Sequence, residues 1–172
     1  MNAGAATGLV ERFTFFWRAD SPFSQWHEGA PFVKHGLRFA TAENWMMWRK
    51  AQLFGAPAEL QAAILAAGAA EAKQLGRQVP GFVDAVWQVA ARPLVAEGNY
   101  AKFTQNPAAL RALLATAGTT LVEASPRDRL WGIGLGAEDS RALSRATWLG
   151  RNWLGEVLTD IRDTLIAARS NA

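Results

Sequence analysis

The sequence predicts a mainly α-helical fold with a small antiparallel β-sheet, built as one compact domain. Its 172 residues suit a single hydrophobic core, and 50% apolar with 19% charged residues is the composition of an ordinary globular protein. Short aromatic segments come first, and longer segments with apolar residues at helical spacing follow. We expect residues 1–11 to be disordered or irregular and residues 12–169 to form the domain.

Three short segments rich in aromatic and β-branched residues predict the sheet. They are RFTFFW (12–17), PFV (31–33) and LRF (37–39), and the KHG between the last two suits a tight turn. We expect the three segments to pair in one antiparallel sheet. TTLVEA (119–124) is the single strand expected late in the chain.

The first helices are marked by their ends. Thr41 suits an N-cap for a helix over AENWMMWRKAQLF, which runs to Gly55. Two short alanine-rich helices, AELQAAILAAG and AAEAKQLG, each end at a glycine suited to a C-cap.

The later helices follow from proline positions and apolar spacing. Pro93 is expected to break or kink a helix between GFVDAVWQVAA and LVAEGNYAKFTQ. Asn106 and Pro107 form a cap followed by a first-turn proline, which predicts a helix toward Gly118. Apolar residues at helical spacing predict a last helix over residues 152–169.

Composition disfavours several classes of function. A chain without cysteine has no disulfide and no thiolate ligand, and its two histidines, His27 and His35, stand in no metal-ligand spacing, so we expect neither metal nor cofactor. The net charge of +3 is small, and the basic residues are scattered through the chain. This favours an anionic small molecule over a dedicated nucleic-acid partner. No apolar run approaches the ~20 residues of a membrane span and no basic leader begins the chain, so a cytoplasmic protein without membrane contact is expected.

The segment LVEASPRDRLWGIGLG (121–136) places acids and an aromatic ring where the backbone must turn. Asn, Gly or Ser would suffice for a turn alone, so Glu123, Asp128 and Trp131 indicate a further role. The alternative for Asp128 is ordinary turn chemistry after Ser-Pro. The glycines match neither a dinucleotide fingerprint nor a P-loop, and they suit a close approach of backbone to a ligand.

Glu43 is the second acid of interest. In the first turn of its helix a carboxylate is favoured by the helix dipole, which is the structural interpretation. The functional interpretation is that Trp45, Met46 and Met47 surround it with apolar groups that change its proton affinity. Lys50 falls on the same helix face, so an acid and an ammonium group can point into one cleft.

Seven segments form a recognisable set: FFW near the start, SPFSQW (21–26), FATAENWMMWRKAQLF (39–54), AKQLGRQV (72–79), KFTQNPAALRALLATAG (102–118), LVEASPRDRLWGIGL (121–135) and WLGRNWLGEVL (148–158). Together they resemble the NADAR family, also called YbiA-like. The resemblance runs in order over residues 13–166 and departs at Gln25, where the family usually has Asn.

The resemblance implies a compact, mainly α fold and an enzyme that hydrolyses N-glycosidic bonds of ribose phosphates. Family members cleave phosphoribosylamino pyrimidine and pyrimidinedione intermediates of riboflavin synthesis, which is the first function expected here. The alternative is an ADP-ribosyl glycohydrolase that removes ADP-ribose from a nucleobase such as guanine, with ADP-ribosylated DNA as a partner. A non-catalytic reader of ADP-ribose-type ligands is the third, and the oligomeric state stays open.

Matching the family motifs also assigns site residues. Glu43 and Asp128 are the expected catalytic pair: one carboxylate stabilises the cation that develops on the sugar, and the other serves the departing base. Candidates for phosphate contact are Lys50, Lys73 and Arg77, and candidates for stacking on the base are Trp87 and Trp131.

Four further residues complete the expected site. Ser24, Gly132 and Asn152 fall in the motifs as substrate-binding candidates, although capping a helix beside the cleft is the alternative for Asn152. Glu123 is expected mainly to support Arg129 or a backbone turn, with catalysis as its alternative.

Overall fold

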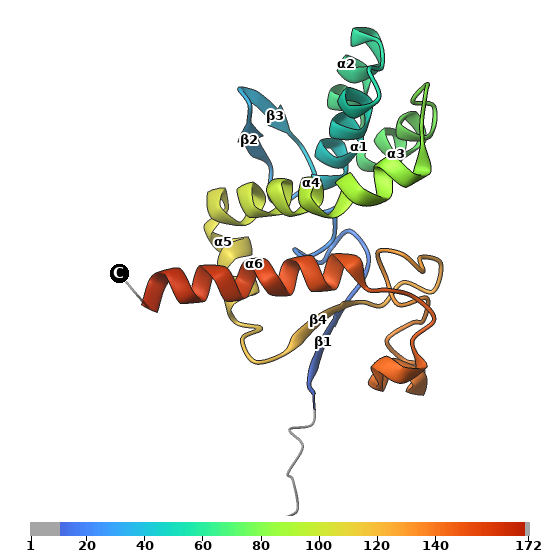
Figure 1. Ribbon diagram of the computed structural model, residues 1–172. Coiled ribbons are helices and arrows are strands. Elements are labelled where there is room, and N and C mark those ends of the chain that lie inside the picture. Colours follow the sequence, from blue (N-terminus) through green and yellow to red (C-terminus); the bar gives the residue numbers. More distant parts are fainter. Residues whose placement is uncertain (1–10, 171–172) are drawn as a thin grey trace, which may run out of the picture.

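A computed structural model describes residues 11–170, so most of the N-terminal segment predicted to be irregular lies outside the described residues (Figure 1). The described chain is mainly helical, as predicted. Its helices are α1 (Ala42–Leu53), α2 (Ala58–Ala66), α3 (Ala69–Arg77), α4 (Asp84–Gln105), α5 (Pro107–Leu114) and α6 (Trp153–Ser170). In Figure 1, α4 and α6 cross the middle of the molecule, with α1, α2 and α3 on one side and the strands β1 and β4 on the other.

The predicted antiparallel sheet exists as a two-stranded hairpin. Strands β2 (Phe32–Lys34) and β3 (Leu37–Phe39) pair antiparallel, with Val33 opposite Arg38. His35 and Gly36 form the turn with φ of 52° and 73°, the left-handed conformation that a two-residue hairpin turn requires.

The first strand was expected in this sheet, and that expectation is wrong. Strand β1 (Phe13–Phe16) pairs in parallel with the late strand β4 (Thr120–Glu123), and Phe16 lies opposite Glu123. Parallel strands need a long crossover connection, and here α1–α5 supply it. A short apolar strand carries no information about so distant a partner.

Of the break or kink expected at Pro93, the break is absent, since α4 continues through this residue to Gln105. Proline leaves the carbonyl oxygen of Val89 without its helical donor, but Val89 is 80% exposed and water can take that place. Tertiary contacts hold the helix on the other face: Trp45 Nε1 donates to the Leu94 carbonyl oxygen at 2.7 Å. The neighbouring helix α5 ends at Leu114, before the predicted Gly118.

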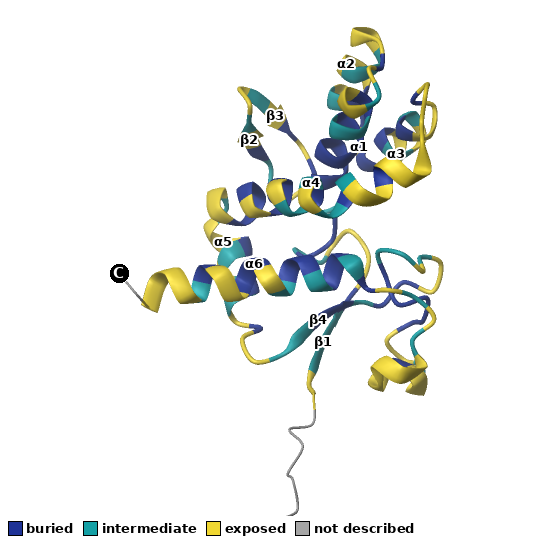
Figure 2. Cartoon of the chain, in the orientation of Figure 1, coloured by how far each residue is buried: buried dark blue, intermediate teal, exposed yellow. Residues whose placement is uncertain are grey.

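The main core lies between α1, α4 and the β2–β3 hairpin. Trp45 is fully buried at its centre, in edge-to-face contact with Phe39 at 5.1 Å between ring centroids. Gly98 on α4 makes this packing possible, since a Cβ there would come within 2.2 Å of the Trp45 ring. Figure 2 shows α1 buried along most of its length.

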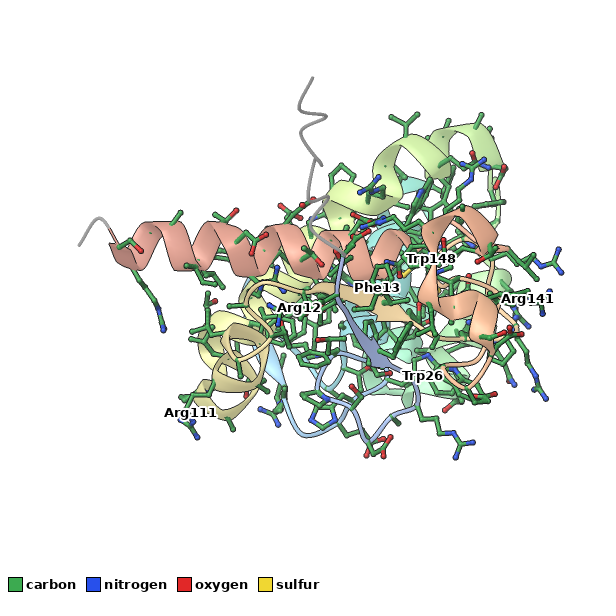
Figure 3. All side chains as sticks on the ribbon, turned by 90° about the horizontal axis from the view of Figure 1, so that it is seen from below. Arg12, Phe13, Trp26, Arg111, Arg141 and Trp148 are labelled. Carbon is green, nitrogen blue, oxygen red and sulfur yellow. The ribbon has the colours of Figure 1, made fainter. Side chains whose placement is uncertain are left out.

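A smaller core supports the strand that leads to the candidate site. Val122 of β4 packs with Ile133 and Leu135 of the following loop, beside Phe13 and Trp148. The Phe13 and Trp148 rings lie 5.3 Å apart and are neighbours in Figure 3. This cluster fixes the loop after β4 against the sheet.

Candidate active site

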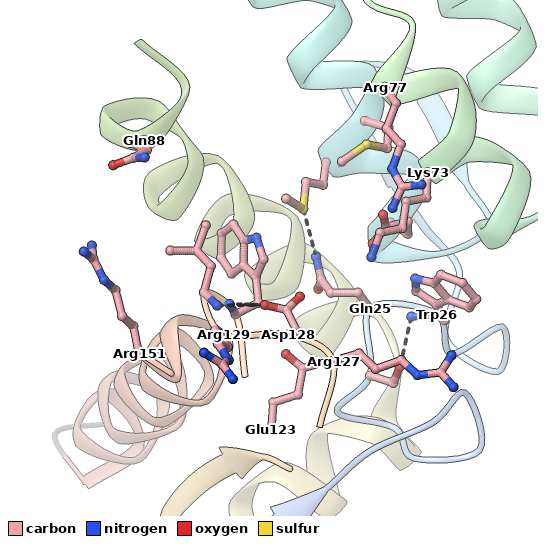
Figure 4. A pocket seen from close by; sticks show the side chains of 16 residues that line it. Gln25, Trp26, Lys73, Arg77, Gln88, Glu123, Arg127, Asp128, Arg129 and Arg151 are labelled. Carbon is pink, nitrogen blue, oxygen red and sulfur yellow. Dashed lines mark hydrogen bonds between the residues drawn. The ribbon is translucent and has the colours of Figure 1, made fainter. Parts of the chain in front are cut away.

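A cavity of about 660 Å³ lies where the end of β4, the start of α1 and the helix α3 meet (Figure 4). A second cavity of about 630 Å³ adjoins it. Glu123, Asp128 and the basic residues Lys73, Arg77 and Arg127 line both cavities. The two cavities are therefore two ends of one cleft, and the shared acids stand at their junction.

Asp128 is fixed by the turn that follows β4. Its Oδ1 atom accepts hydrogen bonds from the backbone nitrogens of Leu130 at 2.9 Å and Trp131 at 2.8 Å. Asp128 also lines the cavity. One side chain therefore makes the hydrogen bonds of a turn and reaches the cleft, two roles that the sequence alone left as alternatives. Two donors on one oxygen fix the orientation of this carboxylate.

Glu43 reaches the same cavity from the first turn of α1. Thr41 caps that helix by accepting from the Asn44 backbone nitrogen at 3.3 Å. Burial raises the pKa of Glu43 to about 7, and nearby Asp128 adds to the rise. Lys73 and the Trp26 side chain partly offset it. Near neutral pH this carboxyl group exchanges a proton readily.

Glu123, the last residue of β4, brings a third carboxyl group to the cleft. Burial raises its pKa to about 8, and the neighbouring Asp128 and Glu43 charges add to the rise. In residues 11–170 its Oε2 atom is buried without a hydrogen-bond partner, and no hydrogen bond joins it to Arg129. The expected supporting role toward Arg129 therefore has no counterpart in these contacts.

Basic side chains surround the three acids. Lys73 and Arg77, two of the candidates for phosphate contact, project from α3. Three further arginines come from the loops around Asp128: Arg127, Arg129 and Arg151. Figure 4 shows Arg151 and Gln88 on one side of the cavity and Lys73 and Arg77 on the other. The loop arginines were missed because they stand in no periodic pattern. For Arg127 and Arg129, the place beside the acid in SPRDR was the available signal.

The loop over residues 21–27 closes another wall. Ser24, Gln25 and Trp26 all line the first cavity. The buried Lys102 of α4 donates to the Ser24 carbonyl oxygen at 2.8 Å, and Asn99 Nδ2 donates to Gln25 Oε1 at 2.8 Å. The long helix α4 therefore holds this loop by two side chains.

Two of the predicted binding residues on helices lie outside the cleft lining. Lys50 Nζ donates to the Gly76 carbonyl oxygen at 2.8 Å and lies 4.1 Å from the centre of the Phe82 ring. It ties α1 to the end of α3 instead of pointing with Glu43 into one cleft. Trp87 is buried in the main core, where Lys50 lies 5.8 Å from its ring.

Gly132 and Asn152 lie behind the acids. A Cβ on Gly132 would come within 2.8 Å of the Glu123 carbonyl oxygen, so the glycine permits close packing of the loop on β4. Asn152, with φ of 53°, accepts from the Glu123 backbone nitrogen at 3.0 Å and donates to the Leu121 carbonyl oxygen at 2.9 Å. Both residues position β4, whereas Ser24, Lys73, Arg77 and Trp131 line the cavity.

Carboxylates, guanidinium groups and indoles line the site. Within residues 11–170, no group of three or more His, Cys, Asp or Glu side chains is arranged to hold a metal ion. No helix in the described part of the chain is both long and apolar enough to cross a membrane. What the arrangement offers is acid–base and electrostatic chemistry on an anionic ligand.

The chain is similar to known proteins over most of its length. A family model described as NADAR domain matches residues 15–166. N-glycosidase R617 of Acanthamoeba polyphaga mimivirus is 35% identical over 168 residues, which are 90% of this chain and 96% of that protein. The chloroplastic riboflavin biosynthesis protein PYRR of Zea mays is 33% identical over 106 residues, which are 59% of this chain and 15% of that protein. The NMR structure of the E. coli protein YbiA matches with a TM-score of 0.73 and 25% identity, covering 96% of this chain and 91% of YbiA.

Proposed function

This chain belongs to the NADAR domain family, and from that premise we propose that it is an N-glycosidase that hydrolyses the ribose C1–N bond of a phosphoribosylamino pyrimidine or pyrimidinedione. The mimivirus relative aligns over nearly its whole length and is named an N-glycosidase, which supports the reaction class. The name of the maize relative links a related segment to riboflavin biosynthesis, which supports the substrate class.

One observation carries the proposal: Glu43 and Asp128, far apart in the sequence, line the same cavity. Breaking a ribose C1–N bond develops positive charge on C1 and the ring oxygen. A fixed carboxylate beside that charge stabilises the transition state, and the doubly hydrogen-bonded Asp128 suits this role. Glu43, with its pKa raised to about 7, suits proton exchange during the reaction.

The remaining lining fits a phosphorylated sugar that carries a planar base. Lys73, Arg77 and Arg127 stand beside the acids and are the expected phosphate contacts. Trp131 is partly buried, in edge-to-face contact with Trp153 at 5.7 Å, and its ring is the expected platform for the heterocycle.

A second substrate class is favoured by the extent of the cleft. The second cavity continues past Asp128 to Trp17 and Arg18, an aromatic ring and a cation beyond the proposed sugar position. A phosphoribosylamino pyrimidine has one phosphate and one ring, whereas an ADP-ribosyl adduct carries a second ribose, a second phosphate and adenine. Removal of ADP-ribose from a nucleobase is therefore the alternative function.

The test is parallel incubation of the purified protein with a phosphoribosylamino pyrimidine, an ADP-ribosylated DNA oligonucleotide and NAD. Mass spectrometry of the products is expected to show ribose 5-phosphate and the free pyrimidine. Release of ADP-ribose from DNA alone would select the alternative. Hydrolysis of none of the three would contradict both and leave a non-catalytic reader.

A further inference from the structure

We infer that Glu123 is a third catalytic residue, which donates the proton that the departing nitrogen needs while Glu43 takes the proton of the attacking water. This inference rests on the proposed function and divides its chemistry among three carboxyl groups. Its basis is the placement of Glu123 at the junction of the two cavities, with a buried carboxyl oxygen that has no partner.

The backbone of Glu123 is held on every side. Its nitrogen donates to Asn152 Oδ1 at 3.0 Å, and its carbonyl oxygen accepts from the Ile133 nitrogen at 3.0 Å. Phe16 lies opposite it in the parallel sheet, and Gly132 packs against its carbonyl oxygen. The chain thus fixes the start of this side chain with several elements.

The carboxyl group itself has no comparable structural duty. In the described chain no salt bridge includes Glu123, and its Oε2 atom has no hydrogen-bond partner. A buried polar atom without a partner destabilises the folded state, so such atoms are rare unless a ligand or reaction uses them. Figure 4 shows the group beside Asp128, directed into the cavity.

Burial of Glu123 favours its protonated form. The charged groups that line the cleft with it are Glu43 on α1, Lys73 and Arg77 on α3, Arg127, Asp128 and Arg129 in the loop after β4, Arg151 before α6, and Arg18 after β1. Burial and the two neighbouring acids outweigh Lys73 and raise the pKa of Glu123 to about 8. A neutral carboxylic acid at pH 7 is a proton donor, which is the role that Glu123 takes here.

The C1–N bond breaks with its electron pair passing to nitrogen, which takes the proton of the Glu123 carboxylic acid. The water oxygen forms a bond to C1, and one water proton passes to the Glu43 carboxylate. The products are a sugar with a hydroxyl group on C1 and the free amine, and proton exchange with solvent restores both glutamates.

The test compares two substrates that share the phosphoribosyl group and differ in the leaving group. The departing nitrogen of a phosphoribosylamino pyrimidine needs a proton. The second substrate, 4-nitrophenyl ribofuranoside 5-phosphate, releases 4-nitrophenolate, which is a stable anion and needs no proton. Glu123→Gln is expected to lower kcat/KM about 10²–10⁴-fold for the first substrate and less than about tenfold for the second. Glu138→Gln, an exposed acid outside both cavities, is the matched control and leaves both rates unchanged.

A second measurement makes the test independent of the activated substrate. With the aminopyrimidine, the wild-type rate is expected to fall as pH rises through about 8, and Glu123→Gln removes this alkaline limb. Equal losses on both substrates with the alkaline limb retained would overturn the role of Glu123 and leave the proposed function standing. A wild-type protein that cleaves neither substrate would overturn both. Thermal unfolding of each variant checks that it folds.

Discussion

The backbone nitrogen of Glu43 donates a hydrogen bond of 2.9 Å to the carbonyl oxygen of Gln25. The helix that carries an acid of the cleft is thereby held in register with the loop that forms the neighbouring wall. The same bond satisfies one of the free N–H groups at the start of α1. A change in the Gln25 loop is therefore transmitted to the position of Glu43.

Replacing Gln25 with the family's usual Asn tests whether the contacts of the Gln25 side chain hold this loop in position. Gln25 Oε1 accepts from Asn99 at 2.8 Å, and Gln25 Nε2 lies 3.9 Å from the Met46 sulfur. A side chain one methylene shorter cannot keep both contacts without moving the loop. Gln25→Asn is expected to lower the free energy of unfolding by about 1 kcal/mol and to raise KM about fivefold. Urea unfolding and steady-state kinetics measure the two effects.

Gln61→Asn is the matched control for that change. Gln61 Nε2 donates to the Ala56 carbonyl oxygen at 2.9 Å, and Gln61 lines neither cavity. A similar loss of stability without a change in KM is expected. If both variants raised KM equally, the effect would belong to overall stability and not to the loop.

Two variants of Asp128 are expected to separate the effect of its charge from the effect of its hydrogen bonds in the turn. Asn at this position keeps an Oδ1 atom for the Leu130 and Trp131 nitrogens, so Asp128→Asn should leave stability within about 0.5 kcal/mol of wild type. Loss of the negative charge beside the sugar is expected to lower kcat about 10²–10³-fold. Asp128→Ala loses the hydrogen bonds too and should cost about 1–2 kcal/mol of stability in addition.

Asp139 offers the control for this pair of variants. Its Oδ1 atom accepts from the Arg141 nitrogen at 2.9 Å, which is the same turn chemistry on the surface and outside both cavities. Asp139→Asn should change neither kcat nor KM. Near-normal turnover of Asp128→Asn would instead show that the charge of Asp128 is not used.

Local signals predicted the helices well and the strand partners poorly. Thr41 and Gly55 mark the ends of α1 because caps act over a few residues, and the structure has α1 at Ala42–Leu53. The partner of β1 is set by packing across the whole chain, which a four-residue strand cannot encode. Pro93 follows the same logic, because the exposed position of Val89 and tertiary contacts override a local break.

The candidate site shows the same division. The unusual acids in EASPRD and AENW pointed to Asp128 and Glu43, and both line one cavity. Helical spacing put Lys50 on the face of Glu43, but it does not reveal that Lys50 donates to the Gly76 carbonyl oxygen near the end of α3. The unpartnered oxygen of Glu123 is a property of the folded state, so no sequence pattern reports it.

Lys102 is expected to hold the loop over residues 21–27 in place, while the burial of its amino group lowers the free energy of unfolding. It is fully buried, its Nζ atom donates to the Ser24 carbonyl oxygen, and burial lowers its pKa to about 7. Between about pH 7 and 10.5 the unfolded chain binds more protons at this residue than the folded one, so this group makes stability rise with pH.

Lys102→Met should remove that rise. Relative to the variant, the wild type is expected to gain up to about 1.4 kcal/mol per pH unit between about pH 7 and 10. The variant should also lose catalytic efficiency, because the Ser24 carbonyl oxygen has lost its donor. Urea unfolding across this pH range measures the first effect, and parallel curves for the two proteins would contradict it.

Glu43 is expected to show the opposite dependence on pH. Its folded-state pKa is raised from 4.5 to about 7, so between these values the folded protein binds more protons at Glu43 than the unfolded chain does. The stability contributed by this group is complete below about pH 4.5 and is lost as pH rises through about 7. Glu43→Gln, which cannot ionise, should therefore equal the wild type in stability at pH 4 and exceed it by up to about 3 kcal/mol at pH 8.

The same variant should be nearly inactive, since an amide neither accepts nor donates the transferred proton, with a loss of about 10²–10⁴-fold in kcat. Glu59→Gln is the control, because Glu59 also stands in the first turn of a helix but is exposed on α2. That change should lower stability by about 0.3–1 kcal/mol, through the helix dipole, and leave kcat unchanged. A Glu43→Gln protein that is less stable than wild type at pH 8 would mean that the carboxylate is stabilised by its basic neighbours. In that case Glu43 would be an anion at neutral pH and would not be poised to exchange protons.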